Sequence, residues 1–221
     1  MGHVSDPLRL ELVATALRLN AHGLSQGKSG NVSARVEGGF LVTPTGVAYE
    51  RLVPMDLSLV RSDGTHETGA EPSSEWRMHR DIYAKRADAG AVVHTHSPAA
   101  TSLACLRRGI PAFHYEIAFA GGRDIRCADY ATFGTQELSD FALVALQGRR
   151  ACLLANHGVI AIGADLPSAL DLAEKVEYLA RLYVQALELG DPVILDDDEM
   201  DRILVRFATY GSHGVKSRDL R

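Results

Sequence analysis

Two histidines lie one residue apart in the segment VVHTHS, residues 92–97, where an apolar run ends. Because residues i and i+2 of a strand point to the same face, His94 and His96 are expected to lie side by side. His157 follows later, between two apolar runs that a tight Asn-His-Gly turn or a bulge would connect. Three imidazoles are the ligands expected of a catalytic Zn²⁺ with a position open for substrate. Histidines that only stabilise the fold by hydrogen bonds are the alternative for the pair.

A carboxylate precedes this pair in the segment PSSEW, where Glu75 is expected in the first turn of a helix that starts near Ser73. A glutamate at that position commonly caps the helix or compensates its dipole. The same carboxylate is suited to be a fourth metal ligand, or a base that leaves the metal when substrate arrives. Both interpretations stay open on these residues alone.

Three segments are rich in small and hydroxylated residues of the kind that bind an anion. Ser73 and Ser74 precede the expected helix, where free N–H groups and the positive end of the dipole attract a phosphate. The segments GKSGNVS and TPTG would close around the same anion. Simple N-capping by the serines is the alternative. The stretch GLSQGKS is not a nucleotide-binding P-loop, because three residues rather than four separate Gly23 from Gly27 and a helix precedes it.

The composition favours a globular protein that acts on small molecules. The chain has 221 residues, a net charge of −5, and 46% hydrophobic and 23% charged residues, which fits one domain better than two. It carries no basic block, so nucleic acid is not expected as a partner. No apolar run approaches the roughly 20 residues that span a bilayer, and the first residues do not resemble a signal peptide. We therefore expect a cytoplasmic protein without a membrane partner.

Helical and extended patterns alternate along the chain without an obvious linker, which predicts a single layered α/β domain over residues 1–221. Strands are expected at residues 32–36, 40–43, 56–64, 89–97, 112–122, 124–130 and 150–163. Helices are expected at residues 5–23, 73–87, 98–109, 135–148, 166–190 and 197–210. With the hairpin at 32–43 and the segment 112–122 taken as antiparallel neighbours, the predicted sheet is mixed and mostly antiparallel.

At this point the motifs resemble a known family. GNVSAR, TPTG, PSSEWRMH, VVHTHS and NHG follow one another as in the class II, metal-dependent aldolase and adducin family, which also contains sugar-phosphate epimerases. GIPAFHYEIAFAGG and CADYATFGTQEL are similar to its L-fuculose-1-phosphate aldolase branch. The likeness covers roughly residues 6–210. It implies a three-layer α/β/α fold and a four-fold symmetric homotetramer with active sites between subunits.

The resemblance also implies a role for individual residues. One Zn²⁺ per subunit, or another divalent metal, would be held by Glu75, His94, His96 and His157, and Glu75 would also exchange protons. The implied phosphate site consists of Gly30, Asn31, Thr45, Gly46, Ser73 and Ser74. Tyr115 would donate a proton from a neighbouring subunit, and Tyr210 would assist from a mobile C-terminal tail that begins at about residue 208. Phe133 and Phe207 would line the aldehyde side of the pocket.

The function implied by the resemblance is reversible cleavage of a ketose 1-phosphate, such as L-fuculose 1-phosphate, to dihydroxyacetone phosphate and an aldehyde such as L-lactaldehyde. The alternatives on the same scaffold are an aldolase for 5-deoxyribulose or 5-methylthioribulose 1-phosphate, a sugar-acid phosphate decarboxylase and a ribulose-5-phosphate 4-epimerase. The epimerases characteristically carry aspartate where this chain has Glu75. An adducin-like structural module is the non-enzymatic alternative, and such a module has no reason to keep Glu75, the three histidines and Tyr115 together.

Overall fold

The computed structural model of the chain describes residues 6–67 and 69–209. The strands of these residues form one eight-stranded sheet in the order β4-β3-β2-β1-β5-β8-β7-β6. All neighbouring strands are antiparallel except β6 and β7, which are parallel. The strands are β1 (Asn31–Val36), β2 (Gly39–Val42), β3 (Ser58–Arg61), β4 (His66–Glu67), β5 (Ala91–Thr95), β6 (Cys127–Ala128), β7 (Ala151–Leu154) and β8 (Gly158–Gly163). The predicted mixed, mostly antiparallel sheet is confirmed.

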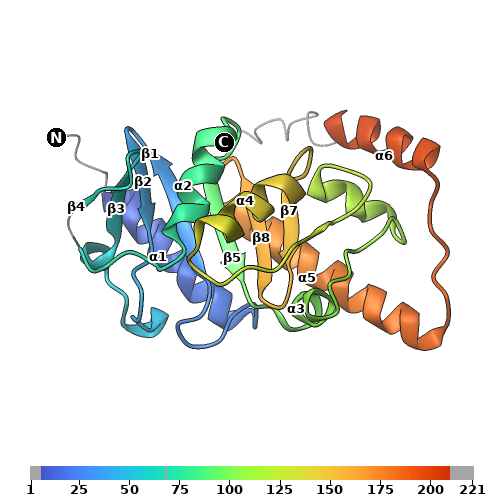
Figure 1. Cartoon of the computed structure of the whole chain (residues 1–221), viewed down its shortest axis with the longest axis horizontal. Helices are drawn as coiled ribbons and strands as arrows, with labels where there is room; N and C mark the ends of the chain where they lie inside the picture. The colour runs from blue at the N-terminus through green and yellow to red at the C-terminus, as the bar shows by residue number, and fades with distance from the viewer. Residues whose placement is uncertain (1–5, 68, 210–221) are drawn as a thin grey trace, which may run out of the picture.

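Helices cover both faces of this sheet, which gives the three layers of the predicted α/β/α fold (Figure 1). One face carries α1 (Asp6–Ala21), α3 (Pro98–Cys105) and α5 (Leu166–Leu189). The other face carries α2 (Trp76–Lys85) and α4 (Gln136–Ala145). A last helix, α6 (Asp197–Thr209), packs against a 3₁₀ helix at Tyr115–Ala120, and two further 3₁₀ helices span Tyr49–Arg51 and Pro54–Asp56. None of the described helices has the length and apolar character needed to cross a membrane.

Strand β5 lies inside the sheet and all five of its residues are buried. Its side chains alternate between the two cores: Val93 packs with the residues of α1, α3 and α5, whereas Val92 packs with those of α2 and α4. Because side chains two positions apart share a face, His94 lies on the same side of the sheet as Val92. The strand therefore directs His94 toward the layer that contains α2.

The start of α2 differs from the prediction. The helix begins at Trp76 rather than near Ser73, and Glu75 precedes it with φ −99° and ψ 13°. The Ser73 hydroxyl accepts a hydrogen bond from the Glu75 N–H at 3.3 Å, so the chain turns once before it becomes helical. The Glu75 carboxylate makes no capping hydrogen bond to the helix. The capping interpretation of Glu75 is therefore wrong.

The segment 112–122, predicted as a strand, is also different. It contains the 3₁₀ helix Tyr115–Ala120, and the His114 side chain caps that helix by accepting a hydrogen bond from the Glu116 N–H at 3.2 Å. Ile117, Ala118 and Ala120 are buried in the core. Because helical turns and a cap satisfy backbone groups locally, the segment needs no strand partner. The neighbour of hairpin strand β1 is β5 instead.

Candidate active site

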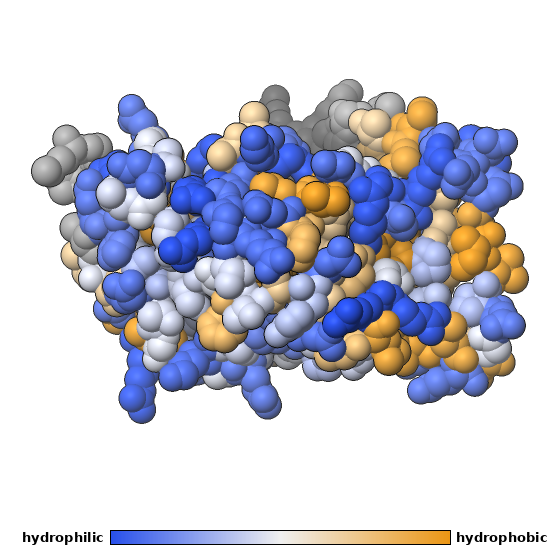
Figure 2. Space-filling view, viewed as in Figure 1, coloured by the Kyte–Doolittle hydropathy of each residue, from blue (hydrophilic) through white to orange (hydrophobic). Residues whose placement is uncertain are grey.

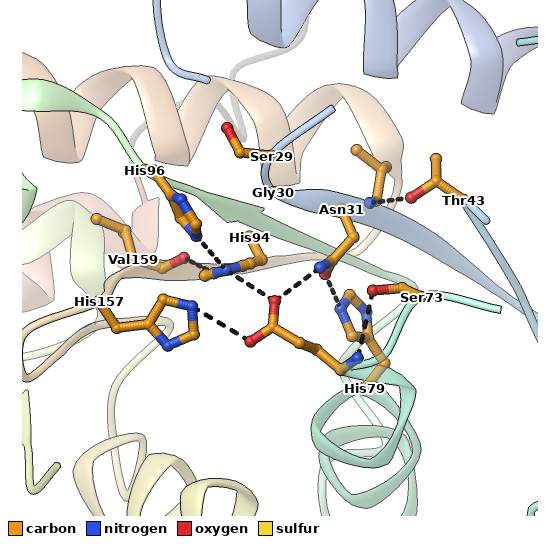
Figure 3. Close-up of polar contacts among 12 residues, drawn as sticks. Ser29, Gly30, Asn31, Thr43, Ser73, His79, His94, His96, His157 and Val159 are labelled. Carbon is orange, nitrogen blue, oxygen red and sulfur yellow. Dashed lines mark hydrogen bonds and ion pairs between the residues drawn. The ribbon is translucent and has the colours of Figure 1, made fainter. Parts of the chain in front are cut away.

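Three imidazoles meet beside the C-terminal end of β5 (Figure 3). The ring centroids of His94, His96 and His157 are 4.9–5.1 Å apart, and one nitrogen of each ring lies within 4.8 Å of the other two. His94 is buried and the other two are partly buried. Strand β5 ends at Thr95, so His96 lies just past the strand rather than on its face, yet its ring still reaches His94 as the spacing predicted.

His157 lies on the tight turn between β7 and β8, which places its ring beside His94 and His96. Asn156 adopts a left-handed conformation there, with φ 53°, which asparagine tolerates better than most residues. Gly158 follows, and a Cβ at that position would lie 2.3 Å from the Thr95 carbonyl oxygen and 2.9 Å from Cδ2 of His96. The glycine therefore permits the close approach that brings the turn against the end of β5.

Glu75 lies among these histidines and is only 6% exposed. Its Oε2 is 3.1 Å from Nε2 of His94 and accepts a hydrogen bond of 2.9 Å from the Asn31 amide. Its Oε1 is 3.3 Å from Nε2 of His157 and is buried without a hydrogen-bond partner among the described residues. A buried carboxylate oxygen without a partner is costly. A cation or a proton at this oxygen would therefore stabilise the site.

Burial and the neighbouring groups set the charges of the site. Burial by itself raises the pKa of Glu75, but His94, His157 and the Asn31 amide outweigh it and hold that pKa below its usual range. Burial, assisted by neighbouring imidazoles, lowers the pKa of both His96 and His157 to about 4. Burial also acts against the charged form of His94, but Glu75 and the backbone carbonyl of Val159 raise its pKa overall. The carboxylate is thus ionised and two of the imidazoles are neutral at pH 7.

These groups fit a divalent metal. The Nδ1 of His94 is 2.8 Å from the carbonyl oxygen of Val159, so Nδ1–H donates to that carbonyl and Nε2 is directed at the other site residues. A second hydrogen bond of this kind typically orients a metal-binding histidine. Neutral imidazoles and one carboxylate are common zinc ligands, and a cation would satisfy the unpartnered Oε1 of Glu75.

A cavity of about 330 Å³ opens beside the histidines. All six residues of the predicted phosphate site line it, and so do Glu75, His96, His157 and Phe133. The same cavity is lined by residues that the sequence did not single out, namely Lys28, Ser29, Pro44, Tyr130, Ala131 and Asn156. The sequence carried a signal for Lys28, because this residue belongs to the segment GKSGNVS, which was predicted to close around the anion.

The loop before β1 packs closely against the segment that carries His94. Gly30 has φ +76°, and a Cβ there would lie 2.6 Å from the carbonyl oxygen of His94. The buried Tyr49 hydroxyl donates a hydrogen bond of 2.8 Å to the Gly30 carbonyl, and Asn31 then pairs with His94 across the β1–β5 ladder. This close packing places Asn31 beside the carboxylate of Glu75.

Other predicted site residues are not brought together within one chain. Tyr115 and Phe207 line a separate groove between the 3₁₀ helix and α6, where their ring centroids are 6.2 Å apart. Phe133 lines the histidine cavity instead, so the predicted pairing of Phe133 with Phe207 in one aldehyde pocket does not occur inside a single chain. Tyr210 lies outside the described residues, as does most of the expected tail.

The chain matches a known protein family over most of its length. The model of the class II aldolase and adducin N-terminal domain matches residues 10–184. The chain belongs to the class II aldolase and adducin family. Class II aldolases depend on a metal, and the group of three histidines described above lies within the matched residues.

Individual aldolases resemble this class II aldolase over nearly their whole length. The 5-methylthioribulose-1-phosphate/5-deoxyribulose-1-phosphate aldolase of Rhodospirillum rubrum is 52% identical over 206 residues, 93% of this chain and 93% of the relative. The L-fuculose phosphate aldolase of Escherichia coli K12 is 48% identical over 207 residues, 93% and 96% of the two chains. A solved structure of an L-fuculose 1-phosphate aldolase superposes with a TM-score of 0.90 at 40% identity, covering 93% of this chain and 98% of that one. These relatives identify the chain as a lyase rather than as a structural module.

Proposed function

We propose that this class II aldolase reversibly cleaves a ketose 1-phosphate to dihydroxyacetone phosphate and a short aldehyde, with one Zn²⁺ per subunit. The observation that carries the proposal is the arrangement of Glu75. Its carboxylate contacts His94 and His157 of the three-histidine group, and its buried Oε1 has no hydrogen-bond partner in the described part of the chain. The carboxylate and two of these imidazoles line a cavity whose other walls are loops rich in hydroxyl and backbone N–H groups. Such a cavity suits the phosphate end of the substrate.

Each group in the site has a task in this reaction. His94, His96, His157 and Glu75 would hold the metal, which when bound supplies a Lewis acid that stabilises the negative charge of an enediolate. The hydroxyls of Ser73, Ser74 and Thr45 and the N–H groups beside Gly30 and Gly46 would bind the phosphate. Glu75, as an ionised carboxylate, would take and return the proton at C3 of dihydroxyacetone phosphate.

Three aldehydes are the candidates for the other end of the cleaved bond. The Escherichia coli relative acts on L-fuculose phosphate, whose cleavage yields L-lactaldehyde as the aldehyde. The Rhodospirillum rubrum relative acts on 5-methylthioribulose and 5-deoxyribulose 1-phosphates, whose cleavage yields methylthio-acetaldehyde and acetaldehyde, respectively. The half-exposed rings of Tyr130 and Phe133 lie at the wall of the cavity, where they provide an apolar surface for a methyl or methylthio group.

We further propose a homotetramer in which Tyr115 serves the site of a neighbouring subunit as proton donor. Tyr115 is 50% exposed and lies away from the histidine cavity of its own chain. Apolar side chains gather at the end of the molecule that carries α6 and the segment leading to it (Figure 2). They include Leu189, Val193 and Val205, which are 92%, 84% and 70% exposed. Apolar surface of this extent is typical of a contact between subunits.

The substrate proposal is tested by supplying dihydroxyacetone phosphate with L-lactaldehyde, methylthio-acetaldehyde, acetaldehyde or glycolaldehyde and comparing the rates of aldol addition. Each rate is expected to fall after treatment with a chelator and to return with Zn²⁺. An enzyme that forms and cleaves no ketose 1-phosphate in this panel, although loaded with metal, would show that the proposed reaction is wrong.

The role of Glu75 is tested with Glu75→Gln. The neutral amide cannot accept the C3 proton, so solvent exchange of that proton should fall by at least about 100-fold. Zinc content should fall less, because three imidazoles remain. A variant that keeps the wild-type exchange rate would contradict the assignment of Glu75 as the base.

A further inference from the structure

Four hydrogen bonds form a chain that leads from Glu75 into the core (Figure 3 shows its first part). The Asn31 amide nitrogen is 2.9 Å from Oε2 of Glu75, and Asn31 Oδ1 is 2.5 Å from Nε2 of His79. The Nδ1 of His79 is 2.6 Å from the Ser33 hydroxyl, which is 2.7 Å from the Tyr83 hydroxyl. None of these five residues is more than 6% exposed, so water does not replace any of the bonds.

The chemistry of the groups in this series of hydrogen bonds determines which group donates and which accepts in each bond. An ionised carboxylate only accepts hydrogen bonds, so the Asn31 NH₂ group must face Glu75 and its Oδ1 must face His79. Oδ1 is an acceptor, so Nε2 of His79 must carry the proton. A fully buried imidazole with no carboxylate in contact stays neutral, so Nδ1 of His79 accepts from the Ser33 hydroxyl. The Ser33 oxygen is then free to accept from Tyr83.

This directed chain is unsuited to proton transfer, because the Asn31 amide neither takes up nor releases a proton readily. It is suited to orientation, since a neutral His79 with the proton on Nε2 can bind only the carbonyl end of Asn31. An amide turned the other way would place its oxygen against Oε2 of Glu75, where two acceptors repel each other. His79 therefore determines which end of Asn31 the carboxylate meets.

We propose that His79, held by Ser33 and Tyr83, is a positioning residue that orients Asn31 and through it the carboxylate of Glu75. Asn31 holds Oε2, so Oε1, which has no hydrogen-bond partner among the described residues, is the oxygen that exchanges the C3 proton once it no longer contacts the metal. The inference rests on the proposed aldolase reaction. His79 is not among the residues that line the cavity, so it acts without touching the substrate.

Two variants of His79 separate positioning from simple packing. In His79→Gln the side-chain amide reaches the place of Nε2 and can donate to Asn31, whereas in His79→Asn it reaches only the place of Nδ1. Loss of a hydrogen-bonding partner behind a metal ligand typically costs about 10–100-fold in activity. We expect a loss of that size in kcat for C3 proton exchange in His79→Asn, with KM for dihydroxyacetone phosphate unchanged, and recovery of most of it in His79→Gln. His66→Asn and His66→Gln, at an exposed histidine of β4, are the matched controls.

The same metal-loaded protein, labelled with ¹⁵N, reports the tautomer directly. His79 is expected to show a protonated Nε2 and an unprotonated Nδ1 in ¹H–¹⁵N correlation spectra of the imidazole rings. A proton on Nδ1 would overturn the proposal, as would equal kinetic losses in both His79 variants or a loss that follows zinc content or unfolding. If the wild-type enzyme did not exchange the C3 proton at all, the aldolase proposal would be wrong, while the spectrum would still decide the direction of the hydrogen bonds.

Discussion

At the scale of single residues, Glu75 is distinguished from a capping glutamate by the direction of its carboxylate. Ser73 accepts the Glu75 N–H and delays the start of α2 until Trp76. The carboxylate is therefore free to contact His94 and His157 instead of the helix N–H groups. One turn of backbone before the helix thus directs the carboxylate of a residue of ordinary helix-capping type toward the three histidines.

Lys28 provides a prediction at the same scale. It is exposed, and among the described residues that line the histidine cavity it is the only lysine or arginine. A cation placed there stabilises a bound phosphate dianion. Lys28→Met should raise KM for dihydroxyacetone phosphate about tenfold, the effect of roughly one charged hydrogen bond, and leave kcat within about twofold. Steady-state kinetics measure both, and Lys28→Arg is the control that should keep KM low. An unchanged KM in Lys28→Met would place the phosphate elsewhere.

The residues of the site differ in how far the sequence could predict them. The proximity of His94 and His96 was predictable because a strand gives its residues a fixed period, and a polar residue between two apolar runs marked His157 as a further candidate. Lys28 and Asn156 line the same cavity. Asn156 directly precedes His157, whereas no local period connects Lys28 to the histidines. Their positions depend on the packing of two loops against the end of β5, which only the assembled sheet determines.

At the scale of elements, α5 stabilises the helix that follows the His-x-His segment. The buried carboxylate of Glu177 accepts hydrogen bonds from the N–H groups of Ala99 and Ala100, at 3.1 and 3.0 Å. These groups belong to the first turn of α3, where a negative charge is favourable. Because α3 begins two residues after His96, Glu177 anchors the segment that carries a predicted metal ligand.

Removing this cap should lower the stability of the protein. Glu177→Ala leaves two N–H groups of α3 without their charged acceptor, so the free energy of unfolding is expected to fall by about 2–4 kcal/mol. Urea unfolding measures the change. Glu174→Ala, on the same helix at a side chain that is 33% exposed, is the control and should cost less than about 1 kcal/mol. Equal effects of the two substitutions would contradict the capping role.

One segment that was predicted wrongly and one helix that was predicted correctly differ in the signals that the sequence carries for them. The segment 112–122 has the alternating composition of a strand, but the His114 side chain caps a 3₁₀ helix there and satisfies an N–H group locally. The long helix α5 was predicted nearly to its ends because it carries its own signals in the sequence, Pro167 near the start and Gly190 at the end. A short helix that has an N–H group satisfied by a histidine side chain is less evident from the hydrophobic pattern of the sequence.

At the scale of the whole molecule, buried histidines make the stability of the metal-free protein depend on pH. Burial lowers the pKa of His79 to about 3 and of His96 and His157 to about 4, from an ordinary value of 6.5. The unfolded chain therefore binds more protons than the folded chain between pH 6.5 and 4, so the free energy of unfolding decreases as the pH falls through that range. The raised pKa of His94 has the opposite effect, and its stabilisation becomes fully present below pH 6.5.

Chelator-treated protein should consequently unfold at a lower urea concentration at about pH 5 than at about pH 7. The expected loss at pH 5 is at most about 2 kcal/mol for the fully buried His79 and less for His96 and His157, which water partly screens. His79→Gln should flatten the dependence, since it removes the largest shift, whereas His66→Gln should leave it unchanged. A metal-free protein as stable at pH 5 as at pH 7 would contradict the neutral state of these histidines.

The proposed tetramer predicts that a complete active site needs two chains. Glu75 lies in the histidine cavity and Tyr115 in a separate groove, so Glu75→Gln and Tyr115→Phe should each inactivate the homotetramer. If the two variants are unfolded together, mixed in equal amounts and refolded with Zn²⁺, about a quarter of the sites in random tetramers combine a wild-type Glu75 with a neighbour's wild-type Tyr115. The mixture should then regain up to about a quarter of wild-type aldolase activity, measured as release of dihydroxyacetone phosphate. Either variant refolded alone is the control. A mixture that stays as inactive as its components, although it forms tetramers, would show that Tyr115 does not act across the subunit boundary.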